Sequence, residues 1–558
     1  MTRVVGMTVR EYRSIEKPLQ IRFPKDQPVV LVGENNAGKS NIVRALHVVL
    51  NPFWPGNYDP EDFEFFNRDK ASCPSIEIRF DASDPMGLRK RYDALVWEWD
   101  SDRDENPRFE GHEVGRDWTK YINNDDRATC MCMFVEAERE LKRHLGYSSK
   151  WTYLSRLMRR FHKSLDAHDE VSQRLAELFE DTKNEFRKVP EFTKFIESLQ
   201  EQMADLLGSM THRLDIDFAA YNPSNYFQSL RLQAKEGDAV RDLEELGTGE
   251  QQILALAFAN AYAEAFHEGV LLVVEEPEAH LHPLAQEALA RWLRTRTAAG
   301  VQTVLTTHSP FFLDMMGLEG LVLVTKGSDG GTSATQLGKK GLVKRLKALG
   351  APDRVTEENV LPFYKSCVTR EILEGFFAKM VVLVEGPSEA QALPVFFESA
   401  EPPLVCSREG VAVIPVGGKG NLAKWHRLFS AYGVPTYVVF DNDSSDDGQA
   451  AKRRDALSAL GVRDEVADEV LGLGGDAWRV EECFCVFGDE FETGLRANFE
   501  DYETFEDEAR AEFADGKPFL ARAVALRLQT EGRETSTGSG WARVDELAAA
   551  IRARLRTR

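Results

Sequence analysis

The segment Gly33–Ser40, with the sequence GENNAGKS, constrains the fold of this chain more than any other stretch. It follows four apolar residues, Val29–Val32, and precedes apolar residues at helical spacing over 42–50. A G-x-x-x-x-G-K-S spacing between a strand and a helix predicts a phosphate-binding loop, because backbone N–H groups and the helix N-terminus converge on phosphate oxygens. We expect Lys39 to reach the β- and γ-phosphates of a nucleoside triphosphate and Ser40 to hold its Mg²⁺.

Two further apolar segments end in groups that suit the same chemistry. GVLLVVEE is predicted to be a buried strand that delivers Glu275 and Glu276 at its carboxyl end, where ligands bind in parallel sheets. One acid suits the magnesium shell and the next suits the polarisation of attacking water. VQTVLTTH predicts a third strand, which ends at His308, within reach of a γ-phosphate.

A second glycine-rich turn begins a long apolar helix. LGTGEQQILALAFANAYAEAF places Gly247, Thr248 and Gly249 at the start of that helix. This is a second anion-binding helix N-terminus, too far along the chain to belong to the first loop.

Length, composition and charge limit the number of domains and the kinds of partner that the chain can have. At 558 residues the chain is too long for one core, so more than one domain is expected. No apolar run approaches the roughly 18 residues of a membrane helix, and seven scattered cysteines fit packed thiols in a reducing cytoplasm. The formal net charge is −22, so a nucleic-acid site would need a local basic surface or bound cations.

In their order along the chain, these segments resemble the ABC-type ATPase head shared by the RecF, SMC and OLD (overcoming lysogenisation defect) families. The matching motifs are Walker A at Gly33–Ser40, the signature at Leu246–Gln251, Walker B at Leu271–Glu276, the D-loop near Glu278–Pro283, and the switch histidine His308. The resemblance implies nucleotide binding by Arg13 in REYRSI, by Gly33, Asn35, Asn36, Ala37, Gly38, Lys39 and Ser40, and by Gly247, Thr248 and Gly249. It also implies catalytic roles for Glu276 and His308, and Mg²⁺ ligation by Ser40 and Glu275.

Two departures from the family pattern are visible. The magnesium acid is Glu275 where such heads usually have Asp, and the signature reads L-G-T-G-E, which places its hydroxyl at Thr248. Because the signature of one head completes the nucleotide site of another in this family, the resemblance implies a homodimer or a higher homo-oligomer.

Residues 142–210, between the two halves of the head, are rich in charge with apolar positions at helical spacing. This pattern predicts a short helical arm, far shorter than the coiled coil of an SMC protein. An ordinary helical lid and an arm that contacts DNA both fit it. After the head, residues 326–374 read as a connector.

Strands are predicted again from Met380, and this time they end in four acids. FFAKMVVLVEGPSEA places Glu385 at a strand end and Glu389 in the first turn of the next helix, while PTYVVFDND ends in Asp441 and Asp443. Strand alternation directs both aspartates to one side. Four crowded carboxylates repel one another unless cations bind between them, and such oxygen ligands suit Mg²⁺ or Mn²⁺.

This second set of motifs resembles a Toprim domain, the domain of topoisomerases, DnaG-type primases and OLD nucleases. Glu385, Glu389, Asp441 and Asp443 match its metal acids. OLD proteins add a further acid and a lysine, which are matched by Glu492, with Glu490 nearby, and by Lys517 in GKPFLARA. The resemblance implies catalytic roles for Glu385, Glu389, Asp441, Asp443, Glu492 and Lys517. It also implies that the first five of these, all acids, bind metal.

The predicted fold is therefore α/β: an ABC-type ATPase head over 1–325 with the helical arm, the connector, and a Toprim domain with a parallel-sheet metal site and a C-terminal helical extension over 375–558. An ABC head followed by a Toprim domain is the OLD-family architecture. It implies ATP hydrolysis, one Mg²⁺ with ATP, and metal-dependent DNA endonuclease activity with two metals at the Toprim site, in the cytoplasm and often in defence against phage.

Three other functions compete with this one. The chain could be a RecF/SMC-like ATPase with a non-catalytic Toprim domain, although its complete acid set argues against that. A topoisomerase or primase would need a DNA-gate tyrosine domain or a zinc module, for which the tail leaves no room. RNA as the substrate stays open, as does a helicase or another defence protein as partner.

Overall fold

The structure, a computed structural model, describes most of the two predicted domains and parts of the segment between the halves of the head. The described residues are 2–51, 53–102, 106–120, 122–136, 157, 168–186, 188–190, 193–194, 197, 233–236, 239–242, 245–266, 269–327, 329–443, 450–512, 516–533 and 538–556. The chain forms two compact units, one of Met1–Cys132 with Leu271–Arg558 and the other of Met133–Val270.

The phosphate-binding loop belongs to a six-stranded sheet with the strand order β14-β13-β3-β12-β11-β8. Its strands are β3 (Val29–Val32), β8 (Cys130–Val135), β11 (Gly269–Glu275), β12 (Gln302–Thr306), β13 (Leu321–Lys326) and β14 (Thr332–Gln336). β3, β11 and β12 are parallel and buried along their whole length, as expected for strands covered on both faces. Their carboxyl ends therefore meet at one edge, and the predicted strands that lead to the loop, to Glu275 and to His308 are confirmed.

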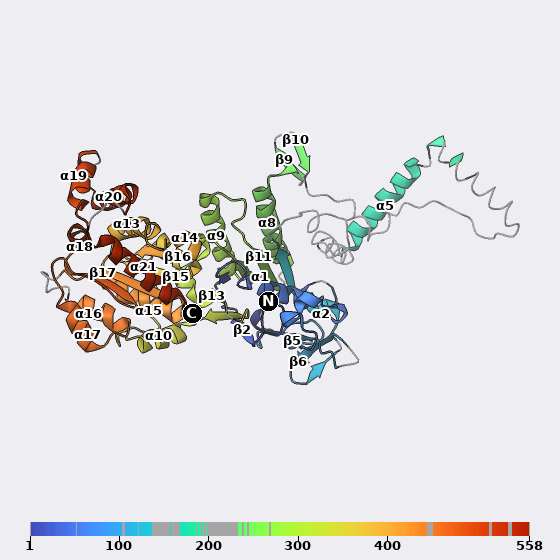
Figure 1. Ribbon diagram of the computed structural model, residues 1–558. Helices are drawn as coiled ribbons and strands as arrows, with labels where there is room; N and C mark the ends of the chain where they lie inside the picture. Colours follow the sequence, from blue (N-terminus) through green and yellow to red (C-terminus); the bar gives the residue numbers. More distant parts are fainter. Residues whose placement is uncertain are drawn as a thin grey trace. The chain divides into compact units, whose positions relative to one another are not determined.

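A second, antiparallel sheet has the strand order β2-β1-β4-β5-β6-β7. Its strands are β1 (Val4–Arg10), β2 (Leu19–Arg22), β4 (Ser75–Phe80), β5 (Tyr92–Glu98), β6 (Arg108–Glu113) and β7 (Trp118–Thr119). Helix α1 (Lys39–Leu50) contacts both β4 and β5 of this sheet and β12 of the other. Its apolar side, which includes Ile42, Leu46 and Val49, is fully buried. Helix α1 therefore packs against both sheets (Figure 1).

The sheet of the head continues past residue 325, into the segment that the sequence assigns to a connector. β14 pairs antiparallel with β13 through a turn in which the side chain of Asp329 accepts a hydrogen bond from the N–H of Gly331 at 2.9 Å. TSATQ lacks apolar alternation because β14 is an edge strand with mostly half-exposed side chains. Helices α10 (Lys339–Ala348), α11 (Val360–Cys367) and α12 (Arg370–Glu374) then lead to the next sheet.

In the unit Met133–Val270 the described elements are helix α5 (Asp169–Phe186), the hairpin of β9 (Gln233–Glu236) and β10 (Ala239–Asp242), and helix α8 (Thr248–Phe266). α5 is the longest described segment of the predicted arm, and most of residues 142–210 lie outside the described residues. Helix α8 begins at the predicted glycine-rich turn.

The C-terminal half is built on a five-stranded sheet with the order β16-β15-β17-β19-β18. Its strands are β15 (Met380–Val384), β16 (Val411–Pro415), β17 (Thr436–Asp441), β18 (Trp478–Val480) and β19 (Phe484–Phe487). β16, β15, β17 and β19 are parallel neighbours, so their carboxyl ends lie at one edge. β18 pairs antiparallel with β19 at the other border of the sheet.

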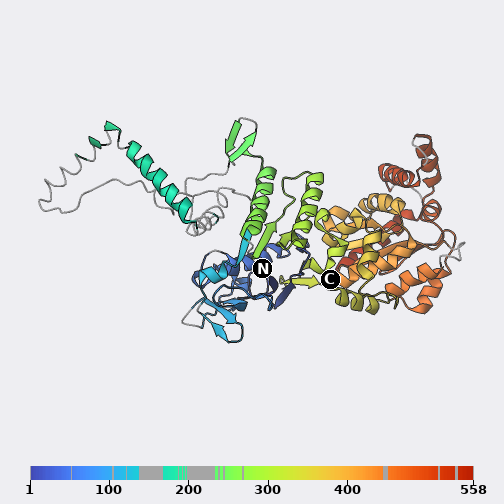
Figure 2. The same ribbon diagram turned by 180° about the vertical axis from the view of Figure 1, so that it is seen from behind.

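Helices cover both faces of this sheet (Figures 1 and 2). The alternate residues Met380, Val382 and Val384 of β15 share a core with helices α13, α18, α20 and α21, while α15 contacts β15 and β17 with other residues. The helices are α13 (Pro387–Glu398), α14 (Cys406–Glu409), α15 (Leu422–Tyr432), α16 (Ala450–Ala459), α17 (Asp464–Leu471), α18 (Phe491–Asn498), α19 (Tyr502–Glu512), α20 (Lys517–Glu531) and α21 (Gly540–Arg556). The predicted C-terminal helices are thus part of the core.

Candidate active sites

The phosphate-binding loop is held in shape by its own lysine. The ammonium Nζ of Lys39 donates to the carbonyl oxygens of Gly33, at 2.9 Å, and Glu34, at 2.8 Å, and only 6% of the residue is exposed. Burial lowers the pKa of Lys39 to about 8, against the attraction of Glu276, Glu278 and Glu34, which raises it. The loop therefore presents a charged group surrounded by carboxylates, at the edge where a phosphate would bind.

Contacts from distant segments fix the rest of the loop. Gly38 has a left-handed backbone (φ 106°), and a Cβ there would lie 2.2 Å from Oγ1 of Thr332. That hydroxyl donates to the carbonyl oxygen of Ala37 at 2.9 Å and lies 2.7 Å from the hydroxyl of Ser14. Asn41 donates to Ser14 at 2.6 Å. Asn35, Asn36 and Ser40 are exposed on the open side of the loop.

The acids of β11 and the histidine after β12 lie at the same edge. Glu275 is buried at the strand end, and the side chain of Glu276 is 47% exposed, with Oε1 3.8 Å from Nε2 of His308. Glu276 has a left-handed backbone (φ 45°), and its N–H donates to the carbonyl of Thr306 at 3.0 Å. This turn directs the Glu276 carboxylate away from the buried strand and toward the open edge.

Glu278 holds the histidine segment in place. Its carboxylate accepts hydrogen bonds from the N–H of His308 at 2.5 Å and from the hydroxyl of Thr307 at 2.9 Å. Burial raises the pKa of Glu278, while burial and the nearby Lys39 lower the pKa of His308. The lower pKa favours the neutral imidazole, which has one nitrogen that donates and one that accepts a hydrogen bond.

Arg13, predicted to bind nucleotide, is bound to a buried carboxylate. Its guanidinium donates to Oε1 of Glu64 at 2.7 Å, and the hydroxyls of Tyr12 and Tyr58 donate to the same carboxylate at 2.8 and 2.7 Å. These hydrogen bonds, from Tyr58 and then Arg13 and Tyr12, lower the pKa of Glu64 against the effect of burial. The structure thus anchors Arg13 from one side, and 18% of its side chain is exposed.

The glycine-rich signature forms the N-terminus of α8. The N–H of Gly247 donates to Oε2 of Glu250 at 2.9 Å, and the side-chain amide of Gln251 donates to the carbonyl of Leu246 at 2.9 Å. Gly247 and Thr248 are exposed, and Gly249 is half-buried. These contacts order the turn while leaving its outer surface open.

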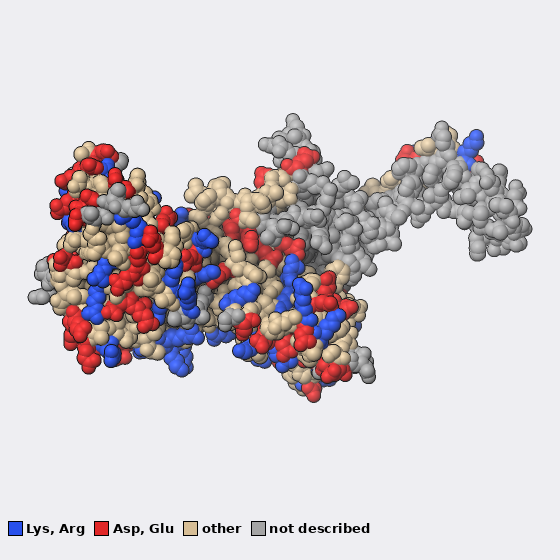
Figure 3. All heavy atoms as spheres, viewed as in Figure 1, with Lys and Arg blue, Asp and Glu red and all other residues tan. Residues whose placement is uncertain are grey.

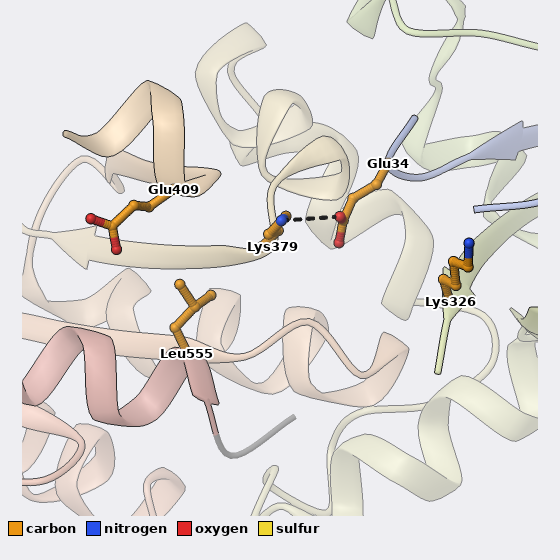
Figure 4. A pocket seen from close by; sticks show the side chains of 5 residues that line it. All are labelled: Glu34, Lys326, Lys379, Glu409 and Leu555. Carbon is orange, nitrogen blue, oxygen red and sulfur yellow. Dashed lines mark ion pairs between the residues drawn. The ribbon is translucent and has the colours of Figure 1, made fainter. Parts of the chain in front are cut away.

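One ion pair joins the phosphate-binding loop to the strand that leads to the C-terminal acids. Oε2 of Glu34 lies 3.5 Å from Nζ of Lys379, the residue before β15 (Figure 4). The pair borders a cavity of about 450 Å³ that is also lined by Lys326, Glu409 and Leu555. Both side chains are substantially exposed, at 46% for Lys379 and 36% for Glu34.

Strand register brings the predicted Toprim acids together. Val384 is the register partner of Val439, so Glu385 follows its strand beside Asp441, whose N–H donates to Oε1 of Glu385 at 2.8 Å. Pro387 begins α13 and places Glu389 in its first turn, 5% exposed. Asp441 is paired in register with Phe487 of β19, and the chain then enters α18, which carries Glu492.

The electrostatics of these acids show that they crowd one another. Burial raises the pKa of Glu389 to about 7, and Glu385 and Glu492 contribute in the same direction. Burial also raises the pKa of Asp441 well above its usual range, again with help from Glu389 and Glu385. The N–H of Phe491 partly offsets this by stabilising the charged Asp441. Crowded, buried carboxylates of this kind are costly unless a proton or a cation neutralises them.

The donor set fits a divalent cation. Oδ1 of Asp441 is buried and accepts no hydrogen bond within the described part of the chain, although buried acceptors are normally satisfied. Carboxylate oxygens without a histidine or thiolate suit Mg²⁺ or Mn²⁺. Among the described residues, no three acidic, histidine or cysteine side chains already converge tightly enough to hold a metal ion, so Glu389, Asp441 and Glu492 would have to draw together around it.

Asp443 reaches the site by a different route from the predicted one. β17 ends at Asp441, and Asp443 has a left-handed backbone (φ 40°) fixed by a hydrogen bond of 3.2 Å from its N–H to the carbonyl of Asp489. Strand alternation therefore does not place it, because it lies beyond the strand. Its Oδ2 lies 2.5 Å from Nζ of Lys419, which also lies 3.4 Å from Oε1 of Glu385.

Lys517 is placed apart from these contacts. Its Nζ lies 3.3 Å from Oε2 of Glu490, and 71% of its side chain is exposed. The structure thus pairs the predicted catalytic lysine with Glu490, the neighbouring acid, at the surface where α18 and α20 begin.

Sequence reasoning missed Lys419, Glu278, Ser14 and Thr332. Lys419 stands in a GGKGN turn that reads as an exposed loop, although the turn follows β16 at the same sheet edge as Glu385. Glu278 was included only in the D-loop motif. Ser14 and Thr332 carry no local signal, because the chain separation between them is 318 residues.

Two family models match the chain, one in each half. The first, an AAA-domain family whose description also mentions an AbiEii toxin and type IV TA systems, covers residues 29–314. The second, described as an overcoming lysogenization defect protein-like TOPRIM domain, covers residues 376–443. The first match includes the phosphate-binding loop and the β11 acids, and the second includes four of the five predicted metal acids.

Known proteins resemble the chain over both halves. The OLD nuclease of Thermus scotoductus is 28% identical over 449 residues, which cover 78% of this chain and 81% of that protein. The Old nuclease of Escherichia phage P2 is 24% identical over 240 residues, 41% of this chain and 38% of that protein. A solved SMC head bound to the C-winged helix domain of ScpA is 19% identical and covers 60% of this chain and 97% of that one, with a TM-score of 0.37.

A P-loop ATPase head and a Toprim domain in one chain define a class of ATP-dependent nucleases. The chain belongs to this AAA-domain family and, through its combination with a Toprim domain, to the OLD family. It accordingly uses a nucleotide and a divalent metal. In the described part of the chain, no helix is both long and apolar enough to span a membrane.

Proposed function

We propose that the Toprim acids form a metal-dependent endonuclease site for DNA and that ATP bound by the head controls it. The observation that carries the nuclease assignment is the buried Oδ1 of Asp441, which accepts no hydrogen bond in the described structure and lies near Glu385 and Glu389. A group in this state needs a proton or a cation, and a nuclease needs cations next to a phosphodiester.

Different residues of the Toprim domain are proposed to hold the metal ions and to contact the DNA phosphate. Glu389, Asp441 and Glu492 would hold one divalent cation, with Glu385 and Asp443 facing a second position. Two such ions, when bound, would activate water and stabilise the leaving oxygen of a phosphodiester. Lys517, exposed at the start of α20, is proposed to approach the DNA phosphate from outside.

Net charge supports DNA binding through cations rather than through a broad basic surface. Acidic and basic side chains of the described residues are interspersed over the face drawn in Figure 3. The chain as a whole carries −22, so a bare acidic site would repel phosphate. Loading the acids with metal removes that repulsion.

In the head, we assign phosphate binding to Gly33, Asn35, Asn36, Ala37, Gly38, Lys39 and Ser40, with Arg13 beside them. Glu276 is proposed to polarise water and His308 to contact the γ-phosphate. The exposed turn of Gly247–Gly249 suits a partner head, which supports an ATP-bound homodimer. One Mg²⁺ would accompany ATP on Ser40 and Glu275.

The head, predicted from the sequence to span residues 1–325, is proposed to extend through its edge strand β14 to Gln336, followed by the rest of the connector and by the Toprim domain from 375. On the OLD resemblance we also propose a cytoplasmic role in phage defence or DNA processing, with a helicase or another defence protein as a candidate partner.

Supercoiled plasmid tests the nuclease proposal directly. The pure protein should nick plasmid with Mg²⁺ or Mn²⁺, and Glu385→Ala should abolish nicking while ATP hydrolysis stays near the wild-type rate. Glu398→Gln, at an exposed position of α13, is the matched control. Nicking by Glu385→Ala at the wild-type rate would refute the site, and cleavage of single-stranded RNA in place of plasmid would reassign the substrate.

The head is tested by ATP hydrolysis. Lys39→Ala should lose nucleotide binding, because its ammonium shapes the loop and is proposed to reach the phosphates. Glu276→Gln should bind ATP but hydrolyse it roughly 100-fold more slowly, the usual contribution of a general base. Hydrolysis by Glu276→Gln at the wild-type rate would show that another group activates the water.

A further inference from the structure

Lys419 is a buried lysine at the centre of the Toprim acids. Only 5% of the residue is exposed, and its Nζ lies 2.5 Å from Oδ2 of Asp443 and 3.4 Å from Oε1 of Glu385. Lysines are rarely buried to this extent unless they are paired. Here both partners are among the predicted metal ligands.

The backbone around Lys419 is built to hold it there. Gly417 and Gly418 both have left-handed backbones, with φ of 71° and 108°. The N–H of Gly418 donates to the carbonyl of Glu385 at 2.8 Å, and the side chain of Asn421 donates to the carbonyl of Val416 at 2.9 Å. The turn is therefore fixed to the end of β15 on one side and to the end of β16 on the other.

We propose that Lys419 is a built-in cation of the nuclease site, which occupies the second metal position between Glu385 and Asp443 until a second divalent ion displaces it. This inference rests on the proposed nuclease function. It divides the acids into two groups, because Nζ of Lys419 lies within ion-pair distance of Glu385 and Asp443, whereas no lysine or arginine of the described residues forms an ion pair with Glu389 or Asp441. The first divalent ion then binds at Glu389, Asp441 and Glu492, and binding of the second is opposed by Lys419.

A lysine in this position should weaken the binding of the second divalent ion, which an ordinary structural ion pair away from the metal ligands would not do. Nζ and a divalent ion would compete for the same oxygens of Glu385 and Asp443. They would also repel each other at short distance in a partly buried site, where charge interactions are strong. Removing the ammonium while keeping the side-chain length should therefore tighten metal binding.

Mn²⁺ titration of the full-length chain without nucleotide tests this. Free Mn²⁺ is measured by electron paramagnetic resonance, and the dissociation constants of the bound ions are fitted for wild type, Lys419→Gln and Lys419→Arg. For Lys419→Gln we expect the weaker of the two Mn²⁺ sites to tighten roughly tenfold or more. Lys419→Arg keeps the charge and should bind Mn²⁺ like wild type.

Lys452→Gln is the matched control. Lys452 is exposed on α16, and its side chain passes within 3.4 Å of the position of a Cβ on Gly420, next to Lys419 in the turn. Its removal should leave both Mn²⁺ affinities unchanged. An equal tightening in Lys452→Gln would mean that general surface charge, rather than Lys419, sets the affinity.

Unchanged or weaker Mn²⁺ binding by folded Lys419→Gln would overturn the proposal. If this variant is unfolded without metal, Mn²⁺ should refold it, because the ion replaces the missing cation, and failure to refold would also overturn it. Failure of the proposed function is distinguishable: wild type would then bind no Mn²⁺, or Glu389→Gln would bind it as tightly as wild type does.

Discussion

Glu389 provides the most quantitative check on the electrostatics of the Toprim site. Its pKa is about 7 in the folded chain and about 4.5 in a solvated one, because it is 5% exposed and lies near Glu385 and Glu492. Between these two pH values the folded state binds more protons than the unfolded state, so the stability of the metal-free protein falls as the pH rises from about 4.5 to about 7.

The size of the effect follows from the shift in pKa. At about 1.4 kcal/mol per pKa unit, ionising Glu389 in the fold costs up to about 3 kcal/mol at pH 8. Glu389→Gln removes the charge and keeps the shape, so the metal-free variant should be more stable than wild type at pH 8 and nearly equal to it at pH 4.5. For a domain of this size, we expect a rise in Tm of roughly 5 °C or more at pH 8.

Thermal melts across this pH range, with EDTA and without nucleotide, measure the difference. The relevant transition is the one that Mn²⁺ shifts in wild type, since a ligand stabilises the domain to which it binds. Glu398→Gln, exposed at the end of α13, is the control and should melt like wild type. If Glu389→Gln and wild type show the same dependence of Tm on pH, the pKa of Glu389 is not raised in the fold, and our account of the crowded acids is wrong.

Three further substitutions test other parts of the structure. Gly38→Ala should abolish ATP binding, measured with a fluorescent nucleotide. Gly38 has a left-handed backbone, and a Cβ on it would lie 2.2 Å from Oγ1 of Thr332. Normal binding would contradict the loop geometry. Asn442→Ala should destabilise the metal-free Toprim domain by about 1–3 kcal/mol in thermal melts, since its buried amide donates to the carbonyls of Val470 and Leu471 at the end of α17 and of Leu473 just after it. An unchanged melt would show that those carbonyls find other donors. Lys379→Ala should change stability by less than about 1 kcal/mol, because its ion pair with Glu34 is largely exposed, and a larger loss would indicate a buried contact.

Much of both candidate sites could be predicted from sequence because each functional residue follows a short, strongly apolar strand. β3, β11 and β15 are recognisable from their composition alone, and the residue after each strand is then placed at a sheet edge. Parallel strands buried on both faces read as continuous apolar runs, and such runs are hard to mistake. The predictions for Lys39, Glu275 and Glu385 combined these strands with the G-x-x-x-x-G-K-S spacing and with the resemblance to ABC-type heads and Toprim domains.

Local signals could not show which distant groups would meet at these edges. Thr332 contacts Ala37 across 295 residues of chain, and it comes from an edge strand that lacks apolar alternation. The same limit explains why the position of Asp443 was predicted for the wrong reason. A left-handed backbone, and not strand alternation, brings its side chain to the site.

The sequence by itself determined the two predicted chemistries, since the phosphate-binding loop and the acids at or just after the ends of β15 and β17 are encoded in short segments. Only the tertiary structure decided how the acids are neutralised. Lys419 lies between Glu385 and Asp443 because β16 is the neighbour of β15 and the turn after it folds over the strand end. From the sequence, a lysine in a glycine-rich turn is expected to be exposed. Its burial beside the acids results from the way the strands assemble into the sheet.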